Sequence, residues 1–521
     1  MIKTSPTEIW AEYQWIVTYM MNRNVFEEIR INEDFMEGKQ WGNIYVDTIP
    51  KPVINVLGRS CKYLVASLAS NEIAVSITPY SSIPDDKQRM KVLAEELESV
   101  IETARIKEAS RLVVRNGCVD GSAFMMQSFD PNIETGQDAK GAIVNQIIDN
   151  TNMFYGNPYS SDTQGQPWII VALRQDVNQV REEAISLGMS KDDAMEISPD
   201  NEGLQVNDDS VNLVTVLIKY YKQKNDKGKT TVWFTKTTMK QTIIEPTDLG
   251  YSRYPISYFP WEKRKNSFLG VPPMSSVIQN QIFINKTFAI AQMYGLQSAF
   301  PKIVYDKNKT NIKEFLDNTT ASAVAGIDIM GKFLEFIKIP DFSNQIIELA
   351  KETIAQTKDA LGVTDVSLGN VKPENTSAII ALQEASAVPL EIQKQNFYEF
   401  WEDTVRNILD IMGCTYGTRM VMSEEFGLAK VDFSVLKDLN YKLKVEIGAG
   451  AQYSEIAQIN TLDKYLQAGL IPGSVHAKLV PSKYILGKDE LVNSMREFEQ
   501  GAMTAQQPQI GQRMLDGSAP L

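Results

Sequence analysis

The sequence predicts an α+β fold in which helical and strand-rich stretches are separated along the chain. Two observations support this prediction. Apolar residues recur at the helical period over much of residues 7–116 and again after residue 273, whereas residues 123–237 contain short runs rich in β-branched and aromatic residues, separated by turns. With 521 residues the chain is too long for one compact core, so several structural units are expected.

Three helical segments are predicted in the first third of the chain. They cover about residues 7–37, 55–70 and 85–116. The third is expected to be one long helix, because Asp85 and Asp86 suit a helix N-terminus and Gly117 and Gly121 suit its end.

A strand-rich segment follows, up to about residue 260. The Asp-Lys-Gly-Lys sequence at 226–229 fits a hairpin turn between its last two strands. A short helix at 178–187 and an acidic loop at 198–210 are expected to interrupt the sheet. The predicted strands are 123–129, 143–148, 168–174, 213–223 and 230–237.

Two helices, 275–296 and 343–361, are predicted to bracket a small insertion. The first carries two adjacent apolar stripes, so neighbours on two sides are expected, although a helix buried in one core has the same pattern. The second is expected to stop at Gly362. The insertion has predicted strands at 302–305 and 333–337 and a short helix at 312–316. The stripes are Ile278, Ile282, Ala289 and Met293, and Val277, Ile284, Phe288 and Ala291; the second helix is expected to bury Ile346, Ile347, Ala350, Ile354 and Leu361.

The last third begins with a loop at 363–375 and continues into a very long helix. Asn375 suits the N-cap of this helix, predicted over 376–412, and Pro389 is expected to kink it by removing a backbone hydrogen bond. A strand pair is predicted from 419–422 and 443–447, followed by helices between residues 453 and 498. The tail, 501–521, is expected to be disordered.

Composition and charge exclude several classes of function. Acidic residues outnumber basic residues by 65 to 52, which argues against a protein that holds nucleic acid over its whole surface. The single histidine, His476, removes most hydrolase and metalloenzyme arrangements, and it is expected on the surface of a helix. The three cysteines lie far apart in the sequence, so neither a metal site nor a disulfide scaffold is predicted.

Motifs of catalysis and of membrane insertion are missing as well. The sequence has no phosphate-binding G-x-x-x-x-G-K-[ST] loop, and Gly448-Ala-Gly450 lacks the third glycine of a dinucleotide site. The chain is therefore predicted not to be an enzyme and to need no cofactor. Glu8 and Glu12 interrupt the apolar run that a signal peptide needs, and no apolar stretch approaches the ~20 residues that cross a bilayer.

Basic clusters stand out in this acidic chain. Lys263-Arg264-Lys265 precedes the first bracketing helix. Four more lysines lie in the insertion: Lys302, Lys307, Lys309 and Lys313. Both clusters fit contacts with DNA phosphates or with an acidic partner, and the alternative is an ordinary solvated loop.

Three segments of the sequence carry a resemblance to a known family. The first is Asn-Glu-Asp-Phe-Met-Glu-Gly-Lys-Gln-Trp at 32–41, followed by Pro-Lys-Pro at 50–52 and the helix at 55–70. The second is Leu-Gly-Val-Pro-Pro-Met-Ser-Ser-Val-Ile-Gln-Asn-Gln at 269–281, and the third, which is the most specific, begins Leu-Gly-Asn-Val-Lys-Pro-Glu-Asn at 368. Together with the order of the elements, they resemble the portal proteins of tailed bacteriophages.

The resemblance implies a phage portal fold, a ring-forming homo-oligomer with wing, stem, clip and crown regions around a DNA channel. By this resemblance the wing would be residues 1–270, with return strands in 414–452. The stem would be the helices 271–298 and 342–361, and the clip would be the residues between them, 299–341. The tunnel loop would be 362–375, the long kinked tunnel helix 376–413, the crown 453–500 and the disordered tail 501–521.

The resemblance also implies a function. The chain would be a structural protein at one capsid vertex of the virion, made in the host bacterial cytoplasm, and a channel for packaging and ejecting viral DNA. The implied partners are further copies of the chain in a dodecamer, the terminase large subunit, a head–tail adaptor, the major capsid protein, scaffold, and DNA that passes without sequence preference; no membrane is implied. An uncharacterised soluble α+β enzyme and another virion structural protein are the alternatives.

Two sets of candidate site residues follow from the resemblance. The four insertion lysines would face the packaging motor, the adaptor or DNA. The candidates for the channel wall lie in the tunnel loop: Asp365, Ser367, Asn370, Lys372 and Glu374.

Overall fold

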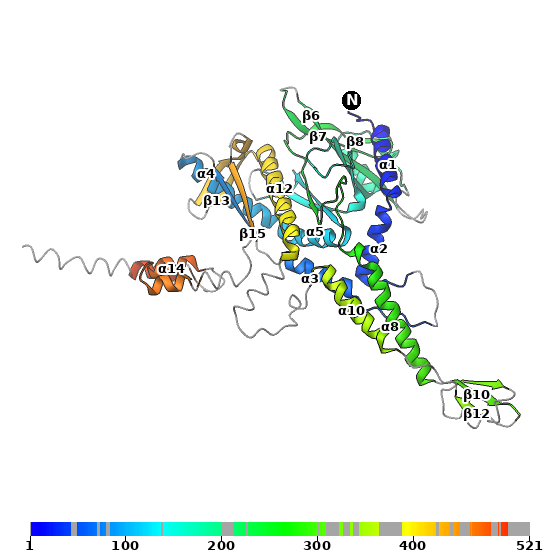
Figure 1. Ribbon diagram of the computed structural model, residues 1–521. Helices are drawn as coiled ribbons and strands as arrows, with labels where there is room; N and C mark the ends of the chain where they lie inside the picture. Colours follow the sequence, from blue (N-terminus) through cyan, green and yellow to red (C-terminus); the bar gives the residue numbers. More distant parts are fainter. Residues whose placement is uncertain are drawn as a thin grey trace, which may run out of the picture. The chain divides into compact units, whose positions relative to one another are not determined.

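The structure is a computed structural model in which the chain forms two compact units, Met1–Glu446 and Ile447–Leu521. Figure 1 shows that helices and sheets both contribute to the first unit, which confirms the α+β prediction. The residues described are 2–42, 49–69, 73–79, 84–136, 139–200, 212–225, 228–300, 302–308, 322–326, 334–336, 343–363, 388–423, 427–437, 441–447, 459, 461–480, 488 and 491–498.

The first predicted helix is two helices, α1 (Pro6–Asn22) and α2 (Val25–Glu37). Asn24 separates them with a φ of 56°, a left-handed conformation that asparagine adopts more readily than most residues. The break lets α1 pack against strands β4 and β6 while α2 packs against helices α3 and α5. The prediction of one helix over 7–37 is therefore wrong at its middle.

A second break divides the predicted helix 85–116. Helix α3 (Val56–Ala69) confirms the segment before it, but the long helix is α4 (Pro84–Thr103) and α5 (Ile106–Asp120), separated by Arg105 at φ 52°. Because of this break, α4 contacts β1 and β13, whereas α5 contacts α3 and β2. Gly117 lies inside α5 rather than at its end, where a Cβ atom would meet the Phe259 ring at 2.4 Å.

Two antiparallel sheets follow in the chain. The larger has the strand order β4-β5-β6-β7-β8, and the smaller has the order β3-β2-β9. All five predicted strands are present, and the hairpin between β6 and β7 is confirmed by the pairing of Lys224 with Thr230. The bounds are β2 (Ser122–Asp130), β3 (Ala142–Ile148), β4 (Met153–Tyr155), β5 (Trp168–Asp176), β6 (Leu213–Lys224), β7 (Thr230–Thr237), β8 (Thr242–Asp248) and β9 (Ile256–Pro260).

Strands β4, β8 and β9 are not in the sequence prediction. Strand β4 has only three residues, and β8 contains Pro246 and pairs with β7 in a broken register. The predicted helix at 178–187 is α6 (Val177–Ser186), and α7 (Lys191–Met195) follows it. Val177 and Val180 of α6 pack against Val214 and Val216 of β6, so this helix covers part of the larger sheet.

The strand pairing predicted for the last third is wrong. Strand β13 (Thr418–Ser423) pairs with the next strand, β14 (Gly427–Asp432). Strand β15 (Tyr441–Ile447) instead pairs with β1 (Ile73–Pro79), from the first part of the chain. A partner so distant in sequence gives no local turn signal, which is the reason for the error.

The bracketing helices are α8 (Ile278–Ala299) and α10 (Asn344–Ala360). Between them, β10 (Lys302–Asp306) pairs with β11 (Ser322–Gly326) and β12 (Leu334–Phe336), so both predicted strands of the insertion are confirmed and β11 is additional. The predicted helix at 312–316 lies outside the described residues. Short 3₁₀ turns are η1 (Asn150–Asn152), η2 (Met274–Ser276), η3 (Val388–Leu390) and η4 (Phe433–Lys437).

Helix α12 (Glu391–Thr415) is the described part of the long predicted helix. Pro389 lies in the turn η3 just before it, while residues 376–387 lie outside the described residues, so the predicted kink stays a prediction. Phe397, Phe400 and Trp401 are almost fully buried, and the rings of Phe397 and Phe400 pack edge-on against Phe259 of β9.

In the second unit, α14 (Gly473–Leu479) and residues 461–467 and 491–498 are helical, which confirms these parts of the predicted helical region. His476 is less exposed than the sequence predicts. Its Nε2 lies 2.8 Å from Asp463 Oδ1, and only 18% of its side chain is accessible. The predicted disordered tail, 501–521, lies outside the described residues.

Candidate functional site

The two helices that bracket the insertion lie side by side and antiparallel (Figure 1). Near the start of α8, Asn280 Nδ2 donates to Oγ1 of Thr357 near the end of α10, at 3.2 Å. Ala350 and Leu361 are buried as predicted, and Gly362, at φ 69°, follows the end of α10. Ile346 is 38% exposed, so the prediction that it is buried is wrong for the isolated chain.

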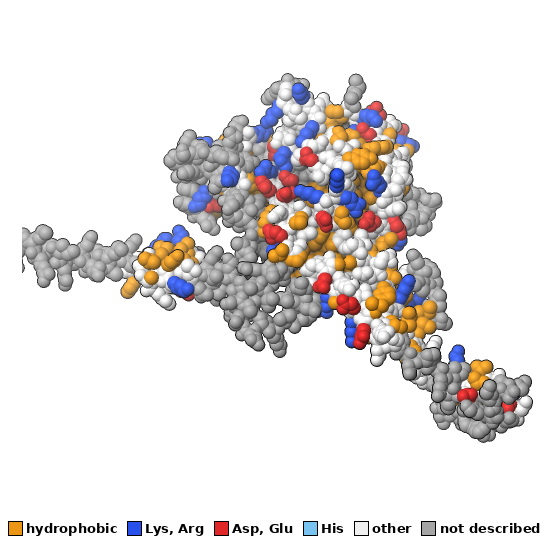
Figure 2. Space-filling view, viewed as in Figure 1, with side chains coloured by type: hydrophobic (Ala, Val, Ile, Leu, Met, Phe, Trp, Pro, Cys, Tyr) orange, Lys and Arg blue, Asp and Glu red, His pale blue; other side chains and the backbone are white. Residues whose placement is uncertain are grey.

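Both predicted stripes of α8 are at least half-buried, but this helix also exposes apolar side chains. Ile290 and Leu296 are each more than half exposed, and so is Leu349 of α10. Phe283 and Ile290 lie seven positions apart, so they share one face of the helix. Apolar side chains are visible along α8 in Figure 2. A contiguous apolar surface on a helix is typical of a contact with another chain.

Gln281 of α8 is remote from α3 in the sequence, yet its side chain caps the N-terminus of α3. Its Oε1 accepts hydrogen bonds from the backbone N–H groups of Val56, at 3.0 Å, and Leu57, at 3.3 Å. Its Nε2 donates to the carbonyl of Ile54 at 2.7 Å and to Asn285 Oδ1 at 3.1 Å. Because the first N–H groups of a helix have no partner inside it, this fully buried amide satisfies groups that would otherwise cost free energy.

Other residues of the first two resemblance segments join the same network. Asn55 Nδ2 donates to the carbonyls of Phe35 and Met36, and Trp41 Nε1 donates to the carbonyl of Pro52. Asn32 Nδ2 contacts Ser275 Oγ at 3.3 Å. The segments at 32–58 and 269–285 therefore converge, and they fix α8 to α2 and α3. The sequence does carry one signal for this network: Gln281 and Asn285 lie four residues apart, so both amides share one face of α8.

Helix α12 is also held by polar contacts along its length. Asn396 Nδ2 donates to the carbonyls of Pro260 and Trp261, and Asn407 Nδ2 donates to Gln127 Oε1 and Ser257 Oγ. These asparagines are buried, so each contact fixes the helix against the smaller sheet.

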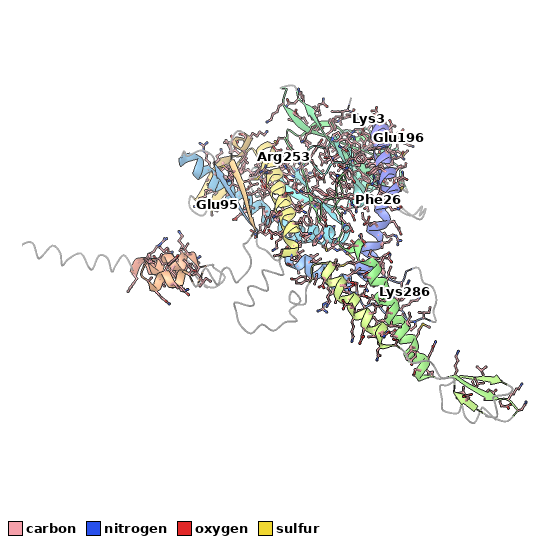
Figure 3. The ribbon with its side chains drawn as sticks, viewed as in Figure 1. Lys3, Phe26, Glu95, Glu196, Arg253 and Lys286 are labelled. Carbon is pink, nitrogen blue, oxygen red and sulfur yellow. The ribbon has the colours of Figure 1, made fainter. Side chains whose placement is uncertain are left out.

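An ion pair adds a further contact to α12. Arg253, which lies beside the helix in Figure 3, binds Asp403 with its Nη2 atom 2.5 Å from Oδ1. Burial raises the pKa of Asp403, and the guanidinium of Arg253 opposes that shift.

The sequence-predicted site residues are only partly described. Lys302 and Lys307 are exposed at the two ends of β10, whereas Lys309 and Lys313 lie outside the described residues. Lys263 of the other basic cluster binds Glu399 of α12 at 2.7 Å, and both side chains are exposed. The channel-wall candidates Asp365, Ser367, Asn370, Lys372 and Glu374 all lie outside the described residues.

Two kinds of feature are absent from the described part of the chain. There, no three acidic, histidine or cysteine side chains lie close enough together to hold a metal ion. Within the same residues, no helix combines the length and the apolar composition that a membrane crossing requires.

The contacts described above hold helices against one another and against the smaller sheet. The sequence model of the Phage P22-like portal protein family matches residues 15–516, nearly the whole chain, so the chain belongs to this family. The resemblance predicted from the three segments is thus confirmed. The family is structural, which argues against the enzyme alternative. No curated protein matches the chain.

Proposed function

We propose that this chain forms a portal ring at one capsid vertex and that viral DNA is packaged and ejected through it. Besides family membership, the exposed apolar surface of α8 and α10 carries this proposal. In a closed ring every subunit has a neighbour on both sides, so a surface left open in one chain is covered by the next copy.

The regions of the portal fold are assigned to the elements as part of the same proposal. Helices α8 and α10 are the stem, the insertion at 299–341 is the clip, and α12 continues the tunnel helix. Residues 362–375 form the tunnel loop and 453–500 the crown, while 1–270 and 414–452 form the wing. The clip docks the terminase large subunit and later the head–tail adaptor, and the capsid protein and scaffold surround the ring.

The charge of the chain suits a channel through which DNA slides. Every phosphate that a protein neutralises adds affinity, so a wall with many basic residues would hold the duplex. A net charge of −13 weakens such contacts, and scattered lysines allow brief ones. Since the sequence has no ATP-binding loop, the terminase supplies the energy for packaging.

Electron microscopy of the purified protein, with its solution mass, tests the proposal. We expect rings of about a dozen subunits with an open axial hole. Ile290→Asp should block ring formation, because it places a charge in the apolar contact between stem helices. Gln292→Asp is the matched control, since Gln292 is exposed on the same helix. A stable monomer from the unmodified chain, or intact rings from Ile290→Asp, would count against this assignment.

The tunnel loop gives a second, independent prediction. If Lys372 contacts passing phosphates, Lys372→Glu should slow DNA packaging in an in vitro packaging reaction while rings still form. Lys191→Glu, at an exposed position on α7, controls for the change in net charge. Unchanged packaging by Lys372→Glu would remove this residue from the channel wall.

A further inference from the structure

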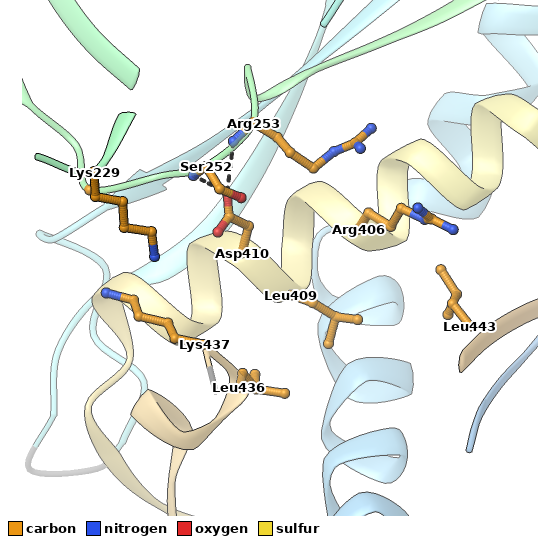
Figure 4. A pocket seen from close by; sticks show the side chains of 10 residues that line it. Lys229, Ser252, Arg253, Arg406, Leu409, Asp410, Leu436, Lys437 and Leu443 are labelled. Carbon is orange, nitrogen blue, oxygen red and sulfur yellow. Dashed lines mark hydrogen bonds between the residues drawn. The ribbon is translucent and has the colours of Figure 1, made fainter. Parts of the chain in front are cut away.

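A cavity of 350 Å³ lies against α12, within the first unit. Its lining comes from five parts of the chain: the start of β7, the loop after β8, α12, the turn η4 and strand β15 (Figure 4). We call it the cationic cleft, and its charged lining residues are Lys229, Arg253, Arg406, Asp410 and Lys437. Its volume falls in the range of about 300–1,000 Å³ that is typical of ligand pockets.

Asp410, the single acidic residue of the lining, is engaged with the backbone. Its Oδ2 accepts hydrogen bonds from the backbone N–H of Ser252 at 2.7 Å, from Ser252 Oγ at 3.1 Å and from the backbone N–H of Arg253 at 3.1 Å (Figure 4). This carboxylate oxygen fixes the 252–253 turn to α12.

Two of the four cations have carboxylate partners outside the cleft. Arg253 binds Asp403, and Arg406 binds Glu402 one turn earlier on α12. No carboxylate among the described residues lies within ion-pair distance of Lys229 or Lys437. The two lysine side chains point toward one another across the cleft in Figure 4.

The thiol nearest these lysines does not supply the missing negative charge. Cys414 Sγ lies 3.2 Å from the carbonyl oxygen of Gly250, to which it donates, and Lys437 contacts the same thiol. Burial is the main effect on Cys414 and raises the pKa of its thiol, which therefore stays protonated at neutral pH. Two ammonium groups thus converge beside a single carboxylate of the described lining, that of Asp410, whose Oδ2 is engaged with the 252–253 turn.

We propose that the cationic cleft binds an acidic peptide segment of a partner protein, with carboxylates between Lys229 and Lys437. Among the aliphatic residues of the lining, Leu443 lines the cleft with the lysines, whereas Leu409 and Leu436 are almost fully buried behind the surface. Charge would therefore hold the segment, and an extended peptide can enter the recess to place a carboxylate between the lysines. A DNA duplex presents its phosphates on a convex surface, so it fits the recess less well. This site goes beyond the proposed ring contacts, which lie on α8 and α10.

Fluorescence anisotropy with a labelled peptide of alternating Glu and Leu tests the proposal on the full-length protein. We expect saturable binding that Lys229→Gln/Lys437→Gln weakens by about tenfold or more, because two charge contacts are lost. The matched control is Lys191→Gln/Lys240→Gln, which removes two exposed lysines of the same unit away from the cleft and should leave binding unchanged. Circular dichroism of both variants checks that they fold.

Three results would overturn the proposal. Equal peptide binding by the cleft variant and the control variant would show that the lysines of the cleft are not involved. A labelled DNA duplex that binds the unmodified protein, competes with the peptide and is lost with the cleft variant would assign the cleft to nucleic acid. A peptide of alternating Lys and Leu should not bind, and its binding at the same site would also contradict the charge argument.

Discussion

Glu12→Ala is expected to lower the free energy of unfolding of the first unit by about 3–5 kcal/mol. Glu12 is the carboxylate partner of Lys219, whose side chain is only 1% exposed, with Nζ 2.5 Å from Glu12 Oε2. The ammonium group also donates to the carbonyl of Lys3 at 2.9 Å. Without Glu12 the charge of Lys219 stays buried without its carboxylate partner, and the ion pair between α1 and β6 is lost. The loss is measured as the change in the free energy of unfolding from urea titrations of the two proteins.

A matched control compares this buried ion pair with an exposed one. Glu37→Ala removes an ion pair with Lys39 in which both side chains are more than half exposed, so it should lower the stability far less than Glu12→Ala does. Replacing both buried partners, with Glu12→Leu and Lys219→Met, should recover much of the stability, since no buried charge remains. Equal losses for Glu12→Ala and Glu37→Ala would contradict the argument.

The pH dependence gives a second readout of the same pair. Burial lowers the pKa of Lys219, and the bond to Glu12 opposes this shift. Without Glu12 the pKa should fall further, so the folded Lys219 loses its proton at a lower pH than the unfolded one. The destabilisation by Glu12→Ala should therefore shrink as the pH rises through the pKa that Lys219 has in the folded variant. Glu37→Ala should show no such trend until the pH reaches the pKa of Lys39, which Glu37 raises.

Gln281→Met is expected to destabilise the contact between α8 and α3 by about 1–3 kcal/mol. Methionine fills a similar volume, but the N–H of Leu57 loses its partner, and the N–H of Val56 and the carbonyl of Ile54 keep only their 2.8 Å bond to each other. Each buried group without a partner costs about 1–3 kcal/mol. Urea unfolding reports the total, and faster hydrogen exchange at the amides of Val56 and Leu57 reports the location.

Two further variants sharpen this test. Gln281→Glu keeps an acceptor for the amides of Val56 and Leu57 but turns a second carboxylate oxygen toward the carbonyl of Ile54, so it should destabilise the contact while the two amides stay better protected than in Gln281→Met. Gln292→Met, at an exposed position of the same helix, should change stability by no more than about 0.5 kcal/mol. If Gln281→Met behaves like Gln292→Met, the amide of Gln281 does not stabilise the start of α3.

Much of the fold could be predicted because its signals are local. The strands β2, β3, β5, β6 and β7 follow from runs of β-branched and aromatic residues, and Gly362 marks the end of α10. The sequence does not predict the two helix breaks, because Asn24 and Arg105 adopt left-handed conformations although neither residue is a glycine or a proline. Their causes are tertiary, since each break turns the next helix toward a different neighbour.

The prediction of the candidate sites rested more on the family resemblance than on the spacing of apolar and charged residues. Periodicity located α8 and suggested neighbours on two sides, but it did not distinguish Ile284, which is buried, from Ile290, which is exposed. The capping role of Gln281 could not be predicted, because its partners at 54–57 are remote in sequence. The cationic cleft joins residues 229, 253, 406 and 437, and only the folded chain brings them together.

The pairing of β1 with β15 has a consequence for synthesis on the ribosome. Strand β1 emerges early, yet its partner is made only after residue 441, when almost the whole first unit has been translated. Until then the edge of β1 presents unpaired backbone groups, to which strands of other chains can add. Closure of the unit is therefore a late step with a high contact order, and nascent chains released before residue 441 carry an open edge.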